Sequence, residues 1–380
     1  MNNYQRDNIE GGRQYENFCN WISFVRWKNL VENLKNIMTS KNRTRPDLSV
    51  SMVLEDTVDA ADVLIILPGE SVVPFLESTG NKRLIIVSFL NQSFEDGSVL
   101  EKPNILVYRV PEIVGKWQEP DTGIAYYCDA VANDKGYAVP DHNQIFHVLF
   151  VDDFIEEILN ALEGRPHRCE FPEAGTLSAD PTAAYDGKTP VPDDNGKFCY
   201  VPKCYFASVG SIVDQIEAFN RLYSTTVIQE ISADSFAYKL CSMYLSYLPV
   251  KKMSYPLPMN IDNRGIFTEL VKTPNNGQVS INIARPGNIR GQHWHNTKWE
   301  IFIVVSGHGL IQERKIGTDE VLNFEVRGEE MRAVIMLPGY THNIINLEKD
   351  KDLVTVMYDN EQFDPKHPDT FFEIVDDTII

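Results

Sequence analysis

Three histidines and one glutamate in the last third of the chain have the spacing of metal ligands. The sequence reads Gly287, five residues, His293-Trp294-His295, four residues, Glu300, and His342 follows within PGYTHNIIN. On a strand, His293 and His295 leave the same face, and Glu300 can return to that face on the neighbouring strand after a short polar turn. Three imidazoles and a carboxylate can occupy four positions around a divalent metal and leave room for water or substrate. We predict a metal site of these four residues, with zinc first and manganese, iron or nickel as alternatives.

The alternative is that these histidines are ordinary surface or core residues without a metal. A lone His-x-His pair would favour that interpretation. Here it would also have to explain Glu300, Gly307 and His342 at suitable separations in a β-rich segment.

The strands that would carry these residues begin near Tyr255. From there the sequence has many short apolar segments separated by turn signals such as Asn276-Gly277, Pro286-Gly287 and Pro338-Gly339. This pattern is typical of an antiparallel barrel or sandwich, and it predicts a domain boundary near residue 250.

The first 250 residues have a different pattern. Apolar residues recur at helical spacing from Trp21 to Met38, and three apolar runs, Val63–Leu67, Leu84–Leu90 and Ile105–Val110, suit buried parallel strands. Residues 171–197 are rich in Pro, Gly, Asp and Ala and predict a loop insertion, and helical spacing resumes at Ser208. An α/β domain is therefore expected over residues 1–250.

Composition limits the classes of function. The chain of 380 residues has a net charge of −19, which disfavours binding to nucleic acids or anionic membrane surfaces. No apolar run is long enough to span a bilayer, and the amino terminus lacks the apolar core of a signal peptide, so we expect a cytoplasmic protein. Six scattered cysteines without Cys-x-x-Cys spacing are expected to be ordinary thiols.

Several segments carry a family resemblance. The metal-ligand spacing resembles the first cupin motif, and Gly339 to Asn346 resembles the second, although Pro338 stands directly before Gly339 where the pattern leaves a residue between. DNRGIFTE, which starts at Asp262, looks like the D-x-R-G-x-F-x-E signature of cupin-type nucleotide-sugar epimerases. There Arg264 and Glu269 would suit a sugar-nucleotide diphosphate and hydroxyls. The alternative is a β-turn closed by a structural pair of the same two residues.

The chain also resembles the CapF family, also called WbjC, of bifunctional capsular polysaccharide biosynthesis enzymes. The carboxy-terminal domain of that family is similar to the segments GQHWHNTKWEIFIVVSGHG, LPGYTHNIINL and FDPKHPDTFFEIV. Its extended short-chain dehydrogenase domain is similar to the segments VYRVPEIVGKW and HVLFVDDFIEEILNALEG. The resemblance implies a Rossmann-like domain over residues 1–250 and a cupin jelly-roll β-barrel over residues 251–380. It also implies that the cupin domain epimerises C3 of a UDP-linked 2-acetamido-2,6-dideoxy-4-hexulose and that the other domain reduces the 4-keto group with NADPH.

The amino-terminal half departs from that family. A reductase needs a glycine-rich turn after its first strand, and the first 60 residues contain only Gly11 and Gly12. The Tyr-x-x-x-Lys pattern occurs only at Tyr247 and Lys251, which we interpret as chance. We therefore expect a truncated, inactive reductase domain that serves as a scaffold, no NADPH binding, and reduction by a separate protein.

Candidates for proton transfer are His293, Tyr340 and His308. A histidine near the position of His293 is the base in metal-free relatives, whereas here His293 is a predicted ligand as well. The leading hypothesis is an epimerase or related isomerase acting on a UDP-sugar. The alternatives are a non-catalytic module that binds nucleotide sugars and a cupin oxygenase that uses iron. Cupins commonly dimerise, so we expect a homodimer.

Overall fold

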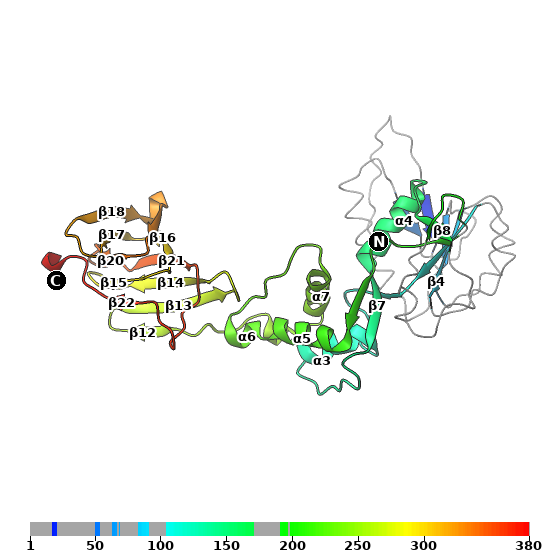
Figure 1. The fold of residues 1–380 in the computed structure, drawn as a ribbon, viewed down its shortest axis with the longest axis horizontal. Helices are drawn as coiled ribbons and strands as arrows, with labels where there is room; N and C mark the ends of the chain where they lie inside the picture. Colours follow the sequence, from blue (N-terminus) through cyan, green and yellow to red (C-terminus); the bar gives the residue numbers. More distant parts are fainter. Residues whose placement is uncertain are drawn as a thin grey trace, which may run out of the picture. The chain divides into compact units, whose positions relative to one another are not determined.

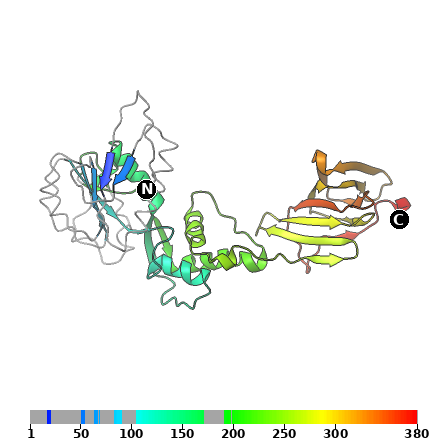
Figure 2. The ribbon, with the colours of Figure 1, turned by 180° about the vertical axis from the view of Figure 1, so that it is seen from behind.

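The computed structural model describes residues 17–20, 50–53, 63–66, 68, 83–90, 104–170, 191–196 and 198–379. These residues form two compact units. The first contains residues 1–216 and 234–248, and the second contains residues 217–233 and 249–380. Figures 1 and 2 show both units from opposite sides.

A mainly parallel sheet forms the centre of the first unit. Its strands are ordered β2-β1-β3-β4-β5-β10-β8-β9, and the first five are parallel to their neighbours. Apolar residues fill β4 and β5 because the sheet is covered, and burial is complete along β5. The bounds are β1 Asn17–Asn20, β2 Val50–Val53, β3 Val63–Ile66, β4 Arg83–Phe89, β5 Ile105–Val110, β8 Arg168–Glu170, β9 Val191–Pro192 and β10 Phe198–Cys199.

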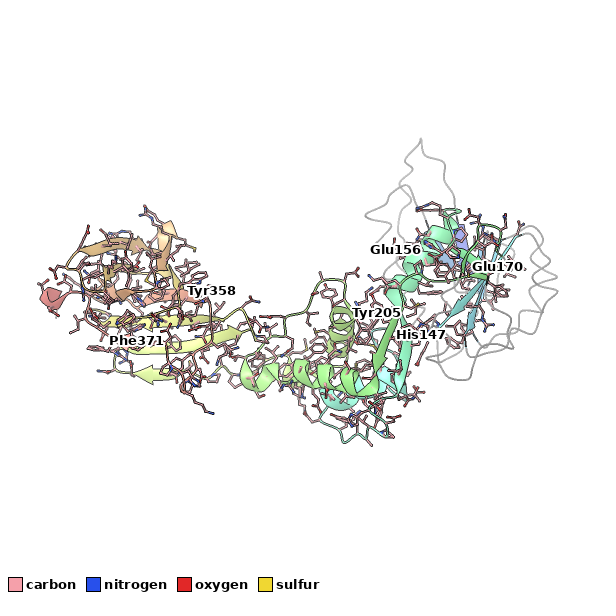
Figure 3. All side chains as sticks on the ribbon, in the orientation of Figure 1. His147, Glu156, Glu170, Tyr205, Tyr358 and Phe371 are labelled. Atoms are coloured by element: carbon pink, nitrogen blue, oxygen red, sulfur yellow. The ribbon has the colours of Figure 1, made fainter. Side chains whose placement is uncertain are left out.

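A smaller sheet and several helices complete the first unit. The sheet has the order β11-β7-β6, and His147 and Tyr205 mark its strands β7 and β11 in Figure 3. Helix α4 presents Phe154, Ile155 and Ile158 to the apolar core of the parallel sheet. The bounds are β6 Glu112–Val114, α3 Gly123–Ala132, β7 Ile145–Phe150, α4 Val151–Leu162, β11 Tyr205–Ser208, α5 Val209–Asn220, α6 Leu222–Thr225 and α7 Phe236–Leu245. Helix α5 ends in the part of the chain that belongs to the second unit, and α6 lies wholly in that part.

Structure and prediction agree on the mixed α/β character of the amino-terminal part. The three predicted strands correspond to β3, β4 and β5, and the predicted helix at Ser208 is α5. The predicted helix Trp21–Met38, the pair Gly11-Gly12 and residues 171–190 lie outside the described residues. Residues 191–192 of the predicted loop form β9, which pairs with β8.

The prediction of a truncated domain was wrong about the start of the sheet. Strands β1 and β2 supply two further parallel strands. Both are four residues long, and β1 reads NFCN. So short and polar a strand has no apolar run by which the sequence could reveal it.

The second unit is all β from residue 260 onward, as predicted, apart from short 3-10 turns. One sheet has the order β12-β13-β14-β21-β16-β19 and the other β18-β17-β20-β15-β22. The bounds are β12 Asn260–Asp262, β13 Gly265–Lys272, β14 Gln278–Ala284, β15 Ile289–Trp294, β16 Glu300–Ser306, β17 His308–Lys315, β18 Val321–Arg327, β19 Ala333–Met336, β20 Tyr340–Asn346, β21 Leu353–Asp359 and β22 Phe371–Phe372. Tyr358 and Phe371 mark one strand of each sheet in Figure 3.

The two sheets of the second unit share one apolar core. Phe302 and Leu353 of the six-stranded sheet belong to the same buried cluster as Ile311 and Ile344 of the five-stranded sheet. Strand β14 alternates buried and half-buried residues along its length, as expected when one face points into such a core. The inner faces of both sheets therefore enclose the space in which side chains from distant parts of the sequence meet.

Two further expectations concern the whole chain. In the part of the chain that the structure describes, no helix has the length and apolar character needed to cross a membrane. The described cysteine side chains, those of Cys128, Cys169, Cys199, Cys204 and Cys241, are free thiols.

Candidate metal centre

The four predicted ligands lie together inside the second unit. One ligand atom from each of His293, His295, Glu300 and His342 lies within 4.8 Å of the others. His293 is on β15 directly opposite His342 on β20, and a register shift after Gly291 brings these two residues into line. The ring centroid of His293 lies 4.9 Å from that of His295 and 4.7 Å from that of His342.

Glu300 reaches the cluster by a different route from the one we predicted. It lies on β16, which pairs with β21 and β19 in the six-stranded sheet and not with β15. The loop after His295 therefore crosses from one sheet to the other, and Glu300 faces the histidines across the interior. Sequence spacing alone could not distinguish a neighbouring strand from a facing one.

Buried atoms without hydrogen bonds indicate that the cluster fits a cation. His295 Nε2, His342 Nε2 and Glu300 Oε2 are buried and have no hydrogen-bond partner among the described residues. Each of these nitrogens lies 3.2 Å from a Glu300 oxygen, without the angles of a hydrogen bond. Buried polar atoms are rarely left unsatisfied, and these converge as ligands of one ion would.

The protonation of the cluster also suits a metal. Burial lowers the pKa of His293 to about 3, so its imidazole is neutral at physiological pH. Burial alone would raise the pKa of Glu300, but the contacts with His295 and His342 outweigh it and hold that pKa well below its usual range. A metal binds neutral imidazole and ionised carboxylate.

His295 is oriented by a residue that sequence reasoning missed. Its Nδ1 donates a hydrogen bond to the carbonyl oxygen of Asp369, which leaves Nε2 to face the cluster. The Asp369 carboxylate accepts backbone hydrogen bonds from Asn296, Thr297 and Lys298, at 2.7 to 2.9 Å. One aspartate thus fixes the whole loop between His295 and Glu300.

Lys298 and Asp359 extend the polar network and were also missed. Lys298 Nζ lies 2.8 Å from Glu300 Oε1 and 3.1 Å from Asp359 Oδ1, and Gln278 Nε2 donates to Asp359 Oδ2 at 3.0 Å. Burial and the neighbouring Glu300 raise the pKa of Asp359 to about 7. A hydrophobic strand pattern could not reveal these residues, because the loop and β21 reach the cluster only through the fold.

Of the predicted proton-transfer residues, Tyr340 lies on the same strand as His342, and His308 lies on the other face of β17 from the residue that pairs with His342. Tyr340 lies two residues before His342 on β20, so both side chains leave the same face. On β17 the inner face carries Ile311 and Glu313, and Glu313 pairs with His342. His308 is an odd number of residues from both, so its side chain leaves the other face of the strand. His308 Nε2 instead contacts Glu325 Oε1 at 2.7 Å.

The predicted substrate residues Arg264 and Glu269 do not contact each other. Arg264 donates to Asp262 Oδ2 at 2.7 Å, and Glu269 pairs with Lys272 at 2.5 Å, so the structural pair that we considered as an alternative is not formed. Asp262 is also reached by Arg290 Nη1 at 3.3 Å. Nε and Nη2 of Arg290 are buried without a hydrogen-bond partner among the described residues. Arg290 pairs with Ile344, whose side chain belongs to the inner core.

In the first unit, Tyr247 of the Tyr-x-x-x-Lys pattern and several buried polar residues have structural contacts. The Tyr247 hydroxyl donates to the Gln118 carbonyl at 2.6 Å, so it is already engaged. Asp153 pairs with Lys239 Nζ at 2.7 Å and links α4 to α7. Ser88 lies in the middle of the parallel sheet, opposite Arg109.

Known proteins are similar to this chain over most of its length. Residues 260–371 match the family model described as the polysaccharide biosynthesis C-terminal domain. A crystal structure of the capsular polysaccharide assembling protein CapF from Staphylococcus aureus is 34% identical, with a TM-score of 0.74 over 94% of this chain and 100% of the other. A structure of CapF with the inhibitor 3-isopropenyl-tropolone is 31% identical, with a TM-score of 0.76 over the same shares.

A curated relative is the UDP-2-acetamido-2,6-beta-L-arabino-hexul-4-ose reductase of Pseudomonas aeruginosa. The two sequences are 28% identical over 269 residues, which is 70% of this chain. The match spans 64% of the length of that relative.

Proposed function

The chain belongs to the CapF family of capsular polysaccharide assembling proteins, and on that premise we propose that its second unit is a metal-dependent cupin barrel that epimerises C3 of a UDP-linked 2-acetamido-2,6-dideoxy-4-hexulose. The observation that carries this proposal is the buried cluster of three histidines and Glu300 with unsatisfied polar atoms. Zinc is the first candidate for the metal.

The reaction is a proton exchange beside a ketone. The C3–H bond breaks, its electrons move into an enolate at C4, and a proton returns to the opposite face of C3. When bound at His293, His295, Glu300 and His342, a divalent metal supplies positive charge that favours the enolate oxygen. Tyr340, on the same face of β20 as His342, is our candidate to carry one of the two protons.

Arg290 and Arg264 would hold the diphosphate of the substrate. Both guanidinium groups contact Asp262, and two nitrogens of Arg290 are left without partners. Guanidinium groups bind phosphate oxygens in pairs, and the two nitrogens of Arg290 without partners could serve as such a pair of donors.

We propose that the first unit, within the predicted domain 1–250, does not reduce the product. The curated relative is named a reductase, but in this chain no glycine occurs between Gly12 and Gly69, so the residues after β1 lack a glycine-rich turn. Such a turn lets the backbone approach the cofactor pyrophosphate. A separate reductase would complete the conversion. We also propose that the protein acts as a homodimer, and light scattering can test its oligomeric state.

The test is proton NMR of the 4-keto sugar nucleotide in deuterated water, with protein of known metal content. We expect loss of the C3 proton signal without NADPH, and no reduced product when NADPH is added. The His342→Ala protein should show no exchange. Tight binding without exchange would favour the nucleotide-sugar binding module, and oxygen consumption that requires iron would favour the oxygenase.

A further inference from the structure

A polar cavity lies at the edge of the six-stranded sheet in the second unit. Its volume is about 420 Å³. None of the candidate metal ligands lines it. The lining residues that matter for its chemistry are Ser224, Thr225, Asn260, Glu269, Lys272 and Gln362.

The cavity and the metal cluster share the inner face of one sheet. Paired residues of an antiparallel ladder project to the same side, and Lys272 pairs with Gln278, Gln278 with Asp359, and Asp359 with Glu300. This row crosses from β13 to β16 in three steps, which is about 14 Å at about 4.8 Å per step. Lys272 of the cavity therefore lies on the same side of the sheet as Glu300 of the cluster, at a distance that only a long substrate can span.

The arginine pair adjoins the same cavity. Asn260 lines the cavity, and Asp262, which contacts both Arg264 and Arg290, follows two residues later on β12. Residues two apart on a strand share a face, so the arginines and the cavity lie along one side of β12. A ligand whose diphosphate lies on the arginines would reach the cavity with its next group.

The lining favours an uncharged ligand with several hydrogen-bonding groups. The Asn260 amide has no hydrogen-bond partner among the described residues, and the Gln362 amide uses its nitrogen on the Thr273 carbonyl at 2.7 Å, which leaves its oxygen as an acceptor. Glu269 and Lys272 neutralise each other. A second phosphate would find no unpaired cation among these residues, whereas the imide edge of a pyrimidine and the hydroxyls of a ribose match amides and hydroxyls.

We propose that this cavity binds the uridine part of the sugar nucleotide, with the diphosphate on Arg264 and Arg290 and the hexulose at the metal cluster. The proposal rests on the function proposed above and names the part of the substrate that each region holds. The segment from Ser224 to Val227, which is the end of α6 and the two residues after it, thereby contributes to specificity for the nucleoside, although it lies outside the all-β segment.

The test is calorimetric titration of the full-length, metal-loaded protein with UDP, uridine and inorganic pyrophosphate. We compare the Asn260→Ala and Gln362→Ala variants with Asn323→Ala, a matched control on β18 that lines neither the cavity nor the cluster. We expect the Kd for UDP and for uridine to rise at least about tenfold in the two cavity variants and to stay unchanged in the control. In the exchange assay, the KM should rise while kcat is retained.

Unchanged affinity for UDP in both cavity variants, or binding of pyrophosphate by the wild type as tight as that of UDP, would overturn the proposal. Metal content and thermal unfolding of each variant show whether it is folded. Failure of the two proposals can be told apart. If the wild type exchanges no C3 proton but the variants lose uridine binding, the cavity assignment stands and the epimerase does not.

Discussion

The four candidate ligands are held in different ways, which determines what their substitution should do. His342 is fully buried and paired with both β15 and β17, whereas His295 follows the end of β15 and is fixed by Asp369. The apolar core nearby contains none of the three histidines. Loss of one imidazole should therefore weaken metal binding more than it weakens the fold.

We expect His295→Ala and His342→Ala each to raise the metal Kd by more than about 100-fold, because even residues that only orient a ligand contribute 10 to 100-fold. Mass spectrometry of the metal content of purified protein measures this. His308→Ala is the matched control, since His308 lies on the outer face of β17, and it should retain full metal content. Full metal content in either ligand variant would remove that residue from the site.

Asp369→Asn tests the orientation of the loop. The amide accepts fewer and weaker hydrogen bonds from the backbone of residues 296–298 than the carboxylate does. We expect metal affinity to fall by about tenfold while the ligands themselves remain. The control Asp364→Asn changes an exposed aspartate that binds Lys366 and His367, and it should have no effect.

At the scale of elements, the turn between β13 and β14 has no space for a side chain at Gly277. Gly277 has a φ of +79°, and a Cβ there would lie 1.8 Å from the Asp359 carbonyl oxygen. Gly287 has a φ of +70° but nothing within 4 Å of such an atom. The same substitution at these two glycines therefore separates backbone strain from crowding.

We expect Gly287→Ala to lower the free energy of unfolding of the second unit by about 1 to 2 kcal/mol, and Gly277→Ala to lower it by roughly 3 kcal/mol or more, because its clash adds to the strain. Denaturant titration followed by tryptophan fluorescence measures both. Equal losses would show that the ladder between β14 and β21 relaxes around the new methyl group.

Strand β7 gives a prediction for acid pH. Burial lowers the pKa of His147 to about 4, and its ring stacks on Phe206 at 4.1 Å between centroids. In the unfolded chain this histidine has an ordinary pKa of about 6.5, so on acidification it binds a proton at a higher pH than in the folded protein. Stability contributed by neutral His147 is therefore present above about pH 6.5 and is lost as the pH falls towards 4.

Thermal unfolding between pH 7 and pH 4.5 tests this expectation. The His147→Phe variant keeps an aromatic ring opposite Phe206 and removes the titrating group, so the melting temperature of its first unit should fall less with acidification. An identical pH dependence in wild type and variant would assign the acid sensitivity to other groups.

At the scale of the whole molecule, metal binding should stabilise one unit and not the other. The ligands all belong to the second unit. A metal present at about 100 times its Kd adds about 2.7 kcal/mol to the free energy of unfolding. We expect a chelator to lower the calorimetric transition of the second unit and leave that of the first unchanged, and re-addition of zinc should restore it.

The sequence by itself determined the elements whose residues follow a local period and the ligands that form one motif. The apolar runs of β3, β4 and β5, the all-β character from residue 260 onward, the family, and the grouping of His293, His295, Glu300 and His342 were all predicted. The strands and the motif from His293 to Glu300 depend on neighbours within a few residues, so alternation and spacing are enough to find them. His342 and the family were found through the resemblance of longer segments.

Only the tertiary structure decided which face each residue occupies and which distant segments meet. It placed Glu300 on the facing sheet, turned His308 outward, and separated Arg264 from Glu269. It also brought Lys298 and Asp359 to Glu300, and the Asp369 carbonyl to His295. Strand β1 was missed because it is short and polar. The physical reason is common to these cases: register shifts, sheet order and loop crossings are set by the packing of the whole unit, and a one-residue change in register moves a side chain to the other face.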